Sequence, residues 1–199
     1  MEKLIIATKN KGKMKDFKEL FSRYGIEVLS LLDLEEDTPD IEETGLTFEE
    51  NAAIKAETIL QTFGLPVIAD DSGLEVDAIG GRPGIYSARY AGEDKDDQAN
   101  LHKVLQELEG VPETDREARF VCVLALARPG KETIFKKGTC EGRISQQPTG
   151  DNGFGYDPIF YPKDMDKTMA QLTSKEKNGI SHRAAAISQL EEWLTKGRD

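Results

Sequence analysis

Apolar and polar residues follow one another along the chain in segments that predict alternating strands and helices. Four short apolar runs predict buried strands at residues 3–7, 26–32, 67–69 and 120–127. Four segments in which apolar or helix-favouring residues recur at helical spacing predict helices at residues 14–24, 47–63, 97–108 and 181–195. This order of elements predicts an α/β fold, in which helices cover the faces of a mixed sheet.

Local signals indicate how some of these elements begin and turn. Thr47 can accept a hydrogen bond from the amide of Glu50, whose side chain can reach back to Thr47, and such a capping box starts a helix. The segment Arg-Pro-Gly-Lys at 128–131 predicts a hairpin that pairs 120–127 with a further strand at 133–136 in antiparallel fashion. Residues 148–157 are rich in Gly, Asn and Asp, which is typical of a binding loop.

Size and apolar content limit what the fold can be. The chain has 199 residues, of which 38% are hydrophobic, enough to bury a core without disulfide bonds. We expect one domain over residues 1–199, built as one body or as two lobes with a shared core. The apolar run at 120–127 is far shorter than the ~18 residues of a membrane-spanning helix, and polar residues from position 8 onward interrupt any secretory signal. We therefore expect a cytoplasmic protein without membrane contact.

The charge balance narrows the choice of partners. The chain carries 26 basic and 37 acidic residues, a net charge of −11, and the phosphates of long nucleic acids would repel it. We therefore expect no nucleic acid partner. Local positive charge in an acidic protein suits a small polyanion instead, although each basic cluster alone could also be solvated surface. The two clusters are Lys9, Lys11, Lys13 and Lys15, and Lys175, Lys177, His182 and Arg183.

Cysteine and histidine are scarce, which limits the possible metal chemistry. The two cysteines, Cys122 and Cys140, form no disulfide framework, and Cys122 lies in an apolar run typical of core. The only histidines are His102 and His182, too few for a three-histidine zinc site. Any hard metal ion must therefore be held by carboxylates.

One candidate for that role is the segment Asp70-Asp71-Ser72-Gly73, which we expect at the carboxyl end of the strand at 67–69. In open α/β sheets ligands collect at such ends. Two adjacent aspartates, with Glu42 and Glu43 upstream, can bind Mg²⁺ or activate a water molecule. The alternative is an Asp-Ser-Gly turn that ends the strand and has no chemical role.

Three further segments could bind a phosphorylated, planar ligand. The stretch from Thr8 to Lys13 lacks the Walker pattern, but a turn from strand to helix offers free amides and a positive helix end to a phosphate. Glycines on both sides of Phe154 leave its ring free to stack on a base, and Asp157 could accept from a ring N–H. Ser181-His182-Arg183 at a helix start could donate to base carbonyls. Each of these segments also has a purely structural interpretation, as a surface turn, a glycine-rich loop or a helix cap.

The order of these motifs is more specific than any one of them. The chain carries in sequence Thr-x-Asn-x-Gly-Lys, Glu-Glu-Thr-Gly-x-Thr-Phe-x-Glu-Asn, Ala-Asp-Asp-Ser-Gly-Leu, Gly-Gly-x-Pro-Gly-Ile-Tyr-Ser-Ala-Arg-Tyr, Gly-Phe-Gly-Tyr-Asp-Pro and Ser-His-Arg. From residue 5 to about residue 186 this series closely resembles the inosine/xanthosine triphosphate pyrophosphatase family, also called Ham1-like or non-canonical purine nucleotide pyrophosphatases. The resemblance implies a two-lobed α/β fold with a long mixed sheet flanked by helices, an active-site cleft between the lobes, and a homodimer.

The resemblance also implies roles for residues at the phosphate end of a substrate. Asp71 matches the proton acceptor and Mg²⁺ ligand, Asp70 a supporting carboxylate and Ser72 a substrate contact. Glu42 matches a further metal-site carboxylate, and Glu43 beside it leaves the choice between the two open. The triphosphate-binding residues match Thr8, Lys9, Asn10, Lys11, Gly12, Lys13 and Lys55.

Base recognition is implied for the later motifs. The matching residues are Phe154, Gly155, Tyr156, Asp157, Lys177, His182 and Arg183. Donors near His182 and Arg183 would meet the C6 carbonyl of inosine or xanthosine and would be unpaired against the amino group of adenine. The implied reaction is Mg²⁺-dependent attack of water, oriented by Asp71, on the α-phosphorus of a purine nucleoside triphosphate. Two alternatives are a nucleotide sensor without catalysis and a carboxylate-metal phosphatase of broader specificity.

Overall fold

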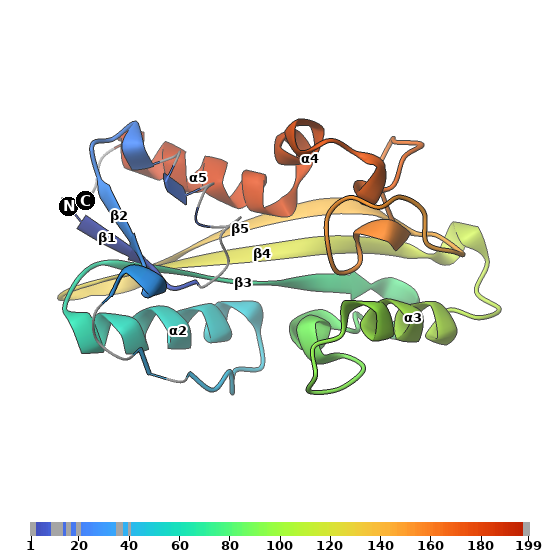
Figure 1. Ribbon diagram of the computed structural model, residues 1–199, viewed down its shortest axis with the longest axis horizontal. Coiled ribbons are helices and arrows are strands. Elements are labelled where there is room, and N and C mark those ends of the chain that lie inside the picture. Colours follow the sequence, from blue (N-terminus) through green and yellow to red (C-terminus); the bar gives the residue numbers. More distant parts are fainter. Residues whose placement is uncertain are drawn as a thin grey trace. The chain divides into compact units, whose positions relative to one another are not determined.

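The computed structural model describes residues 3–8, 14, 17–18, 21–34, 38–39 and 41–196. Its six strands form one mixed sheet in the order β2 (Glu27–Ser30), β1 (Lys3–Ile6), β3 (Val67–Val76), β4 (Glu117–Arg128), β5 (Lys131–Ile144) and β6 (Phe160–Pro162). β1 pairs in parallel with both β2 and β3, whereas β5 and β6 are antiparallel. The predicted α/β class with a mixed sheet is confirmed (Figure 1).

Four α-helices have both ends within the described residues, several short 3-10 helices accompany the sheet, and the described residues 14, 17–18 and 21–22 of the predicted helix at 14–24 are helical as well. The helices are α2 (Phe48–Phe63), α3 (Asp97–Glu107), α4 (Ser174–Ile180) and α5 (His182–Lys196). The 3-10 turns lie at Leu31–Asp33, Asp77–Ile79, Gly84–Arg89, Glu113–Asp115, Asp157–Ile159 and Met169–Gln171. Within the ranges that the structure describes, no helix has both the length and the apolar character needed to cross a membrane.

The chain divides into two compact units. The first consists of Met1–Asp71, Val123–Lys137 and Ala186–Asp199, and the second of Ser72–Cys122 and Gly138–Ala185. The boundary falls within β3, β4 and β5 and near the start of α5, so both units contribute to these elements. A single domain over 1–199 and a cleft between lobes stay predictions.

Each unit has its own apolar core. In the first, β1 is buried from Leu4 to Ile6, and Ala52, Ala56 and Ile59 lie one helical turn apart on the buried side of α2. In the second, the buried cluster includes Leu74, Val76, Leu101, Val104, Phe120 and Phe160. The residues of these cores are the apolar residues whose spacing predicted the strands and helices. Their burial holds these elements in place.

Strand β3 is longer than predicted, and this changes the setting of the acidic motif. The strand runs from Val67 to Val76, so Asp70 to Gly73 lie within it and not at its carboxyl end. The apolar alternation resumes at Leu74 and Val76, both fully buried, and carries the strand through the polar residues. The interpretation of Asp-Ser-Gly as a closing turn is therefore wrong.

Other local predictions hold in part. Thr47 caps α2 by accepting from the amide of Glu50 at 3.1 Å, but the Glu50 carboxylate accepts from Leu46 N at 2.6 Å and not from Thr47. Only two residues, Pro129 and Gly130, connect β4 to β5, as expected for an antiparallel hairpin, and β5 extends well beyond the predicted 133–136. Helix α4 and strand β6 were not predicted.

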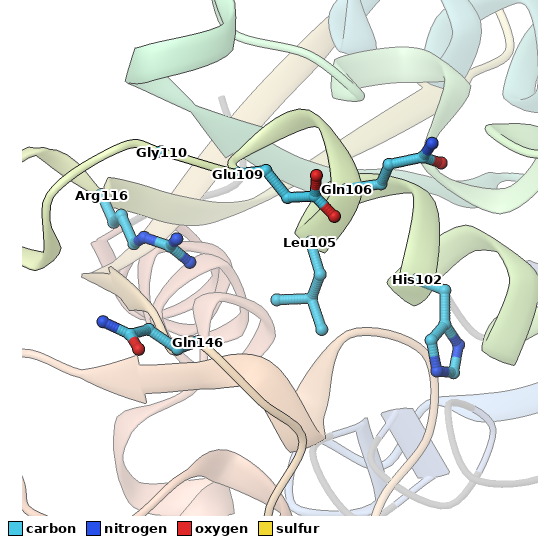
Figure 2. A pocket seen from close by; sticks show the side chains of 7 residues that line it. All are labelled: His102, Leu105, Gln106, Glu109, Gly110, Arg116 and Gln146. Atoms are coloured by element: carbon cyan, nitrogen blue, oxygen red, sulfur yellow. The ribbon is translucent and has the colours of Figure 1, made fainter.

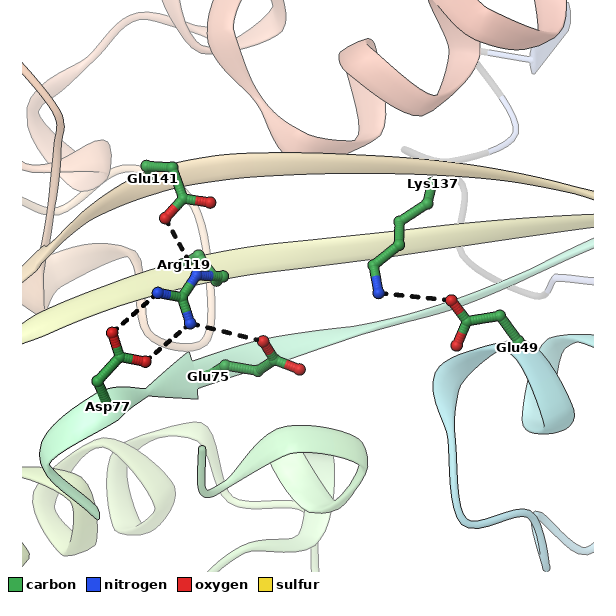
Figure 3. A network of polar contacts seen from close by, with 6 residues as sticks. All are labelled: Glu49, Glu75, Asp77, Arg119, Lys137 and Glu141. Carbon is green, nitrogen blue, oxygen red and sulfur yellow. Dashed lines mark hydrogen bonds and ion pairs between the residues drawn. The ribbon is translucent and has the colours of Figure 1, made fainter. Parts of the chain in front are cut away.

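Arg119 ties neighbouring strands together in the second unit (Figure 3). Its guanidinium forms two hydrogen bonds to Asp77, at 2.8 and 2.9 Å, and one to Glu141 at 3.0 Å. Hydrogen bonds from Arg119 hold the pKa of Asp77 below its usual value. A separate ion pair in the first unit, drawn in the same figure, joins Lys137 to Glu49 at 3.4 Å. Arg119 thus connects β4 to β5 and to the turn that follows β3, away from Asp70 and Asp71.

Candidate functional site

An acidic cluster around one lysine in the first unit carries a first group of predicted site residues. β3 supplies Asp70 and Asp71, and Lys55 comes from the middle of α2. The Lys55 Nζ lies 3.1 Å from Asp71 Oδ1 and 3.2 Å from Glu43 Oε1. Lys55 therefore links the strand that carries the aspartates to the segment that precedes α2.

Burial makes these charges chemically significant. Asp70 and Asp71 are only 6% and 8% exposed. Within the described part of the chain, Asp71 Oδ2 is buried and has no hydrogen-bond partner. Since an unpaired buried acceptor is costly, this oxygen is a candidate to contact a cation or a water molecule.

Burial and neighbouring charges together shift the pKa values of the cluster. Burial raises the pKa of Asp71, the Lys55 ammonium partly offsets this, and the Glu43 and Asp70 carboxylates raise it further. Burial lowers the pKa of Lys55, but the attraction of the same three carboxylates exceeds that effect and raises it overall. Three carboxylates and one ammonium group leave two net negative charges when all are ionised. Both shifts favour the uptake of positive charge.

This donor set fits a hard divalent cation, which prefers carboxylate oxygens. The observation that supports the fit is the buried Asp71 Oδ2, which has no hydrogen-bond partner among the described residues. Over the described ranges, however, no three or more His, Cys, Asp or Glu side chains are grouped as a complete set of metal ligands. The contact with Lys55 is made by Glu43, so the role of Glu42 as a metal ligand stays a prediction.

A glycine-rich loop in the second unit carries a second group of predicted site residues. Asp157, only 4% exposed, accepts a hydrogen bond from Phe154 N at 3.0 Å and an ion-pair contact from Lys177 Nζ. The same ammonium lies 4.9 Å from the centre of the Phe154 ring. The predicted site residues Phe154, Asp157 and Lys177 therefore lie together. Phe154 itself is 60% exposed.

Further hydrogen bonds hold the backbone of this loop. The amide of Asp157 donates to Phe154 O at 3.2 Å, which closes a β-turn over Gly155 and Tyr156. The Tyr156 hydroxyl donates to the carbonyl of Ser87 at 2.7 Å, and the Gly155 amide donates to Asp97 Oδ2 at 2.9 Å. The loop is therefore anchored on two segments distant in sequence.

The remaining predicted residues are only partly described. Ser181 caps the last helix, as predicted, by accepting from Ala184 N at 3.2 Å. The His182 ring stacks on Phe120 of the core, with centroids 5.0 Å apart. Thr8 and Ser72 are described, and Thr8 is buried. Lys9, Asn10, Lys11, Gly12 and Lys13 lie outside the described residues, so their predicted role in triphosphate binding is untested.

A surface cavity of about 570 Å³ in the second unit contains none of the predicted site residues. Figure 2 shows its lining, which is His102, Leu105, Gln106, Glu109, Gly110, Arg116 and Gln146. The Arg116 guanidinium donates to the carbonyls of Val111, Ser145 and Leu108, so it supports the surrounding backbone. The cavity is not part of the candidate site.

Comparison with known proteins adds independent evidence. The dITP/XTP pyrophosphatases of Oceanobacillus iheyensis and Bacillus subtilis are 64% and 57% identical to the chain over 194 residues, 98% of this chain and 98% of each relative. The solved structure of the Staphylococcus aureus Ham1 protein superposes with a TM-score of 0.91 at 50% identity, covering 98% of each chain. That of a HAM1 protein from Coxiella burnetii gives 0.92 at 42% identity, covering 99% of this chain and 100% of that one.

The family model gives the same result over nearly the whole chain. Residues 4–193 match the model of the Ham1 family. The matched range contains the acidic cluster around Lys55 and the glycine-rich loop around Asp157. This chain belongs to the Ham1 family.

Proposed function

We propose that this protein hydrolyses non-canonical purine nucleoside triphosphates, such as dITP, ITP and XTP, to the nucleoside monophosphate and pyrophosphate. Relatives with this activity in their names are 55–64% identical to the chain. The observation that carries the proposal is the buried Asp71 carboxylate, which is paired with Lys55 through one oxygen and whose second oxygen has no hydrogen-bond partner in the described part of the chain. Such a group suits the activation of water beside a phosphate.

The reaction is a displacement at the α-phosphorus. A water oxygen bonds to that phosphorus, the bridging bond to the β-phosphate breaks, pyrophosphate leaves, and the water proton passes to Asp71. Burial raises the pKa of Asp71, which makes its carboxylate a better proton acceptor. Lys55 neutralises charge on the phosphate oxygens, and both groups are held in place by strand and helix, so positioning supplies much of the acceleration.

A divalent metal ion, for which we propose Mg²⁺, would supply further neutralisation of phosphate charge when bound. Asp71 would hold it, with Asp70 in support and either Glu42 or Glu43 as a further carboxylate. Glu43 is favoured by its contact with Lys55. The lysines and amides from Thr8 to Lys13 are proposed to bind the triphosphate.

The glycine-rich loop is proposed to bind the base. The exposed Phe154 ring provides a stacking surface, and Lys177 and Asp157 place a donor and an acceptor beside it. His182 and Arg183 are proposed to donate to the C6 carbonyl that inosine and xanthosine share. We also propose that the protein is cytoplasmic and, as the family resemblance implies, a homodimer; light scattering after gel filtration measures the oligomeric state.

Incubation with ITP and Mg²⁺ tests the proposal, and we expect pyrophosphate and IMP as products. Orthophosphate would instead indicate a phosphatase of broader specificity, and binding without any product would indicate a sensor. Asp71→Asn should nearly abolish turnover while the fold is kept. Asp77→Asn, the same change later in the chain and outside the acidic cluster, is the matched control and should keep wild-type turnover. Equal kcat/KM for ITP and GTP would contradict selectivity for non-canonical bases.

A further inference from the structure

The peptide unit between Phe154 and Gly155 is held at both ends. Its carbonyl accepts from the amide of Asp157 at 3.2 Å, and its N–H donates to Asp97 Oδ2 at 2.9 Å. The first bond lies within the β-turn, but the second reaches a residue 58 positions away, at the first position of α3. The hydrogen bond to Asp97 thus connects this peptide plane to α3, which lies outside the loop.

The turn geometry explains why this amide needs an external partner. Gly155 has φ +60° and Tyr156 has φ −88°, and among the common β-turns only type II′ combines a positive first and a negative second central φ. The amide of the first central residue has no acceptor inside such a turn. A carboxylate at a helix N-terminus is well suited to accept it, because the helix dipole stabilises the negative charge there.

Burial does not orient the neighbouring aromatic ring. Phe154 is 60% exposed, so the position of its ring depends on the backbone that carries it. Phe154 N is held by Asp157, and the next amide along is held by Asp97. We propose that Asp97 is a positioning residue for base binding, which sets the stacking surface of Phe154 without touching the substrate. This inference rests on the proposed function of the loop.

The chain offers a matched control next to Asp97. The Asp96 carboxylate caps the same helix, accepting from Gln98 N at 2.9 Å and Ala99 N at 3.1 Å. Asp96→Ala therefore weakens the start of α3 without removing the contact to Gly155. Asp97→Asn keeps an acceptor oxygen and serves as the conservative variant.

Two measurements test the proposal: the KM and kcat for ITP, from pyrophosphate release, and the Kd for IMP, from calorimetry. Asp97→Ala should raise KM and Kd about tenfold, the factor expected when one charge-assisted hydrogen bond is lost. Because the base is remote from the reacting phosphorus, kcat should change by no more than about twofold. Asp97→Asn should restore most of the affinity, and Asp96→Ala should lower thermal stability but leave KM and Kd at wild-type values.

Several results would overturn this role. Unchanged KM and Kd in Asp97→Ala, equal increases in Asp96→Ala, or no recovery in Asp97→Asn would each do so. A wild-type protein that binds IMP but releases no pyrophosphate from ITP would refute the proposed hydrolysis, while the Kd values still decide the role of Asp97. A wild-type protein that binds no IMP would overturn the role of the loop and of Asp97 together.

Discussion

Replacement of Gly153 by alanine should damage the base-binding loop far more than the same change at Gly155. Both glycines have positive φ, +79° and +60°. A Cβ on Gly153 would fall directly onto Asp157 Oδ2 and within 2.9 Å of its Cγ, whereas a Cβ on Gly155 would meet nothing within 4 Å. The two variants therefore share backbone strain and differ in the collision with one buried carboxylate.

The structure allows the two costs to be separated. Backbone strain from an L-residue in the left-handed region costs about 1–2 kcal/mol in either variant. In Gly153→Ala the displaced Asp157 carboxylate also loses its hydrogen bond from Phe154 N, 3.0 Å long, and a bond to a charged group contributes about 1.5–3 kcal/mol. Lys177 is flexible and can follow the carboxylate, so its ion pair adds nothing. We expect losses of about 2.5–5 kcal/mol for Gly153→Ala and about 1–2 kcal/mol for Gly155→Ala.

Urea denaturation followed by circular dichroism measures the free energy of unfolding of both variants and the wild type. The KM for ITP should rise more in Gly153→Ala, since the Phe154 amide loses the acceptor that positions the ring. Equal losses of stability in the two variants would refute the packing of Gly153 against Asp157. A larger loss in Gly155→Ala would reverse the assignment.

Other predictions concern the acidic cluster, a buried hydroxyl and a helix cap. Lys55→Met removes the positive charge that lowers the pKa of Asp71, so the pKa of Asp71 should rise. Because Asp71 accepts a proton only when it is ionised, the acidic side of the pH profile of kcat/KM should move to higher pH. An unchanged profile would contradict the pairing of Lys55 with Asp71. Tyr156→Phe leaves the Ser87 carbonyl without its 2.7 Å hydrogen bond and should cost about 1–3 kcal/mol in urea denaturation; no loss argues against that bond. Thr47→Ala should cost about 1 kcal/mol through loss of the α2 cap, while Thr47→Ser should retain stability in the same assay; equal values argue against capping.

Local patterns were sufficient to predict most elements of the fold because each element buries its own periodic apolar residues. The pattern failed where polar residues interrupt it. β3 was predicted to stop at Ala69, since four polar or small residues follow, yet these residues lie inside the strand. A buried strand favours apolar residues, so polar residues at its centre conflict with its packing. Such conflicts are expected at functional sites.

Helix α4 was missed for a different reason. Its start carries a capping box, in which Thr173 Oγ1 accepts from Glu176 N at 3.3 Å and Glu176 Oε2 accepts from Thr173 N at 2.8 Å. This signal is legible in the sequence as Thr-x-x-Glu. The helix has seven residues and none is buried, so the apolar periodicity that reveals longer helices is absent.

The candidate site was predictable as a set of residues but not as a set of contacts. Asp70, Asp71 and the loop at 148–157 were predicted from their residue types and spacing. Their partners lie far along the chain: Lys55 is 16 positions from Asp71, and Lys177 is 20 from Asp157. Nothing local couples such pairs, because the contact exists only once the elements that carry them have packed.

Asp96 and Asp97 illustrate the limit of sequence reasoning most clearly. Both are acids at a helix start, and either one would satisfy the preference of that position for a cap or for negative charge. In the structure Asp96 caps the helix and Asp97 accepts from Gly155, because the chain turns between them and directs the two carboxylates to different donors. Because Asp96 and Asp97 satisfy this preference equally well, the sequence does not indicate which of them caps the helix and which accepts from the distant loop. The different roles of Asp96 and Asp97 therefore depend on the packing of α3 beside the loop. Mutation cannot exchange these two roles unless the helix also moves.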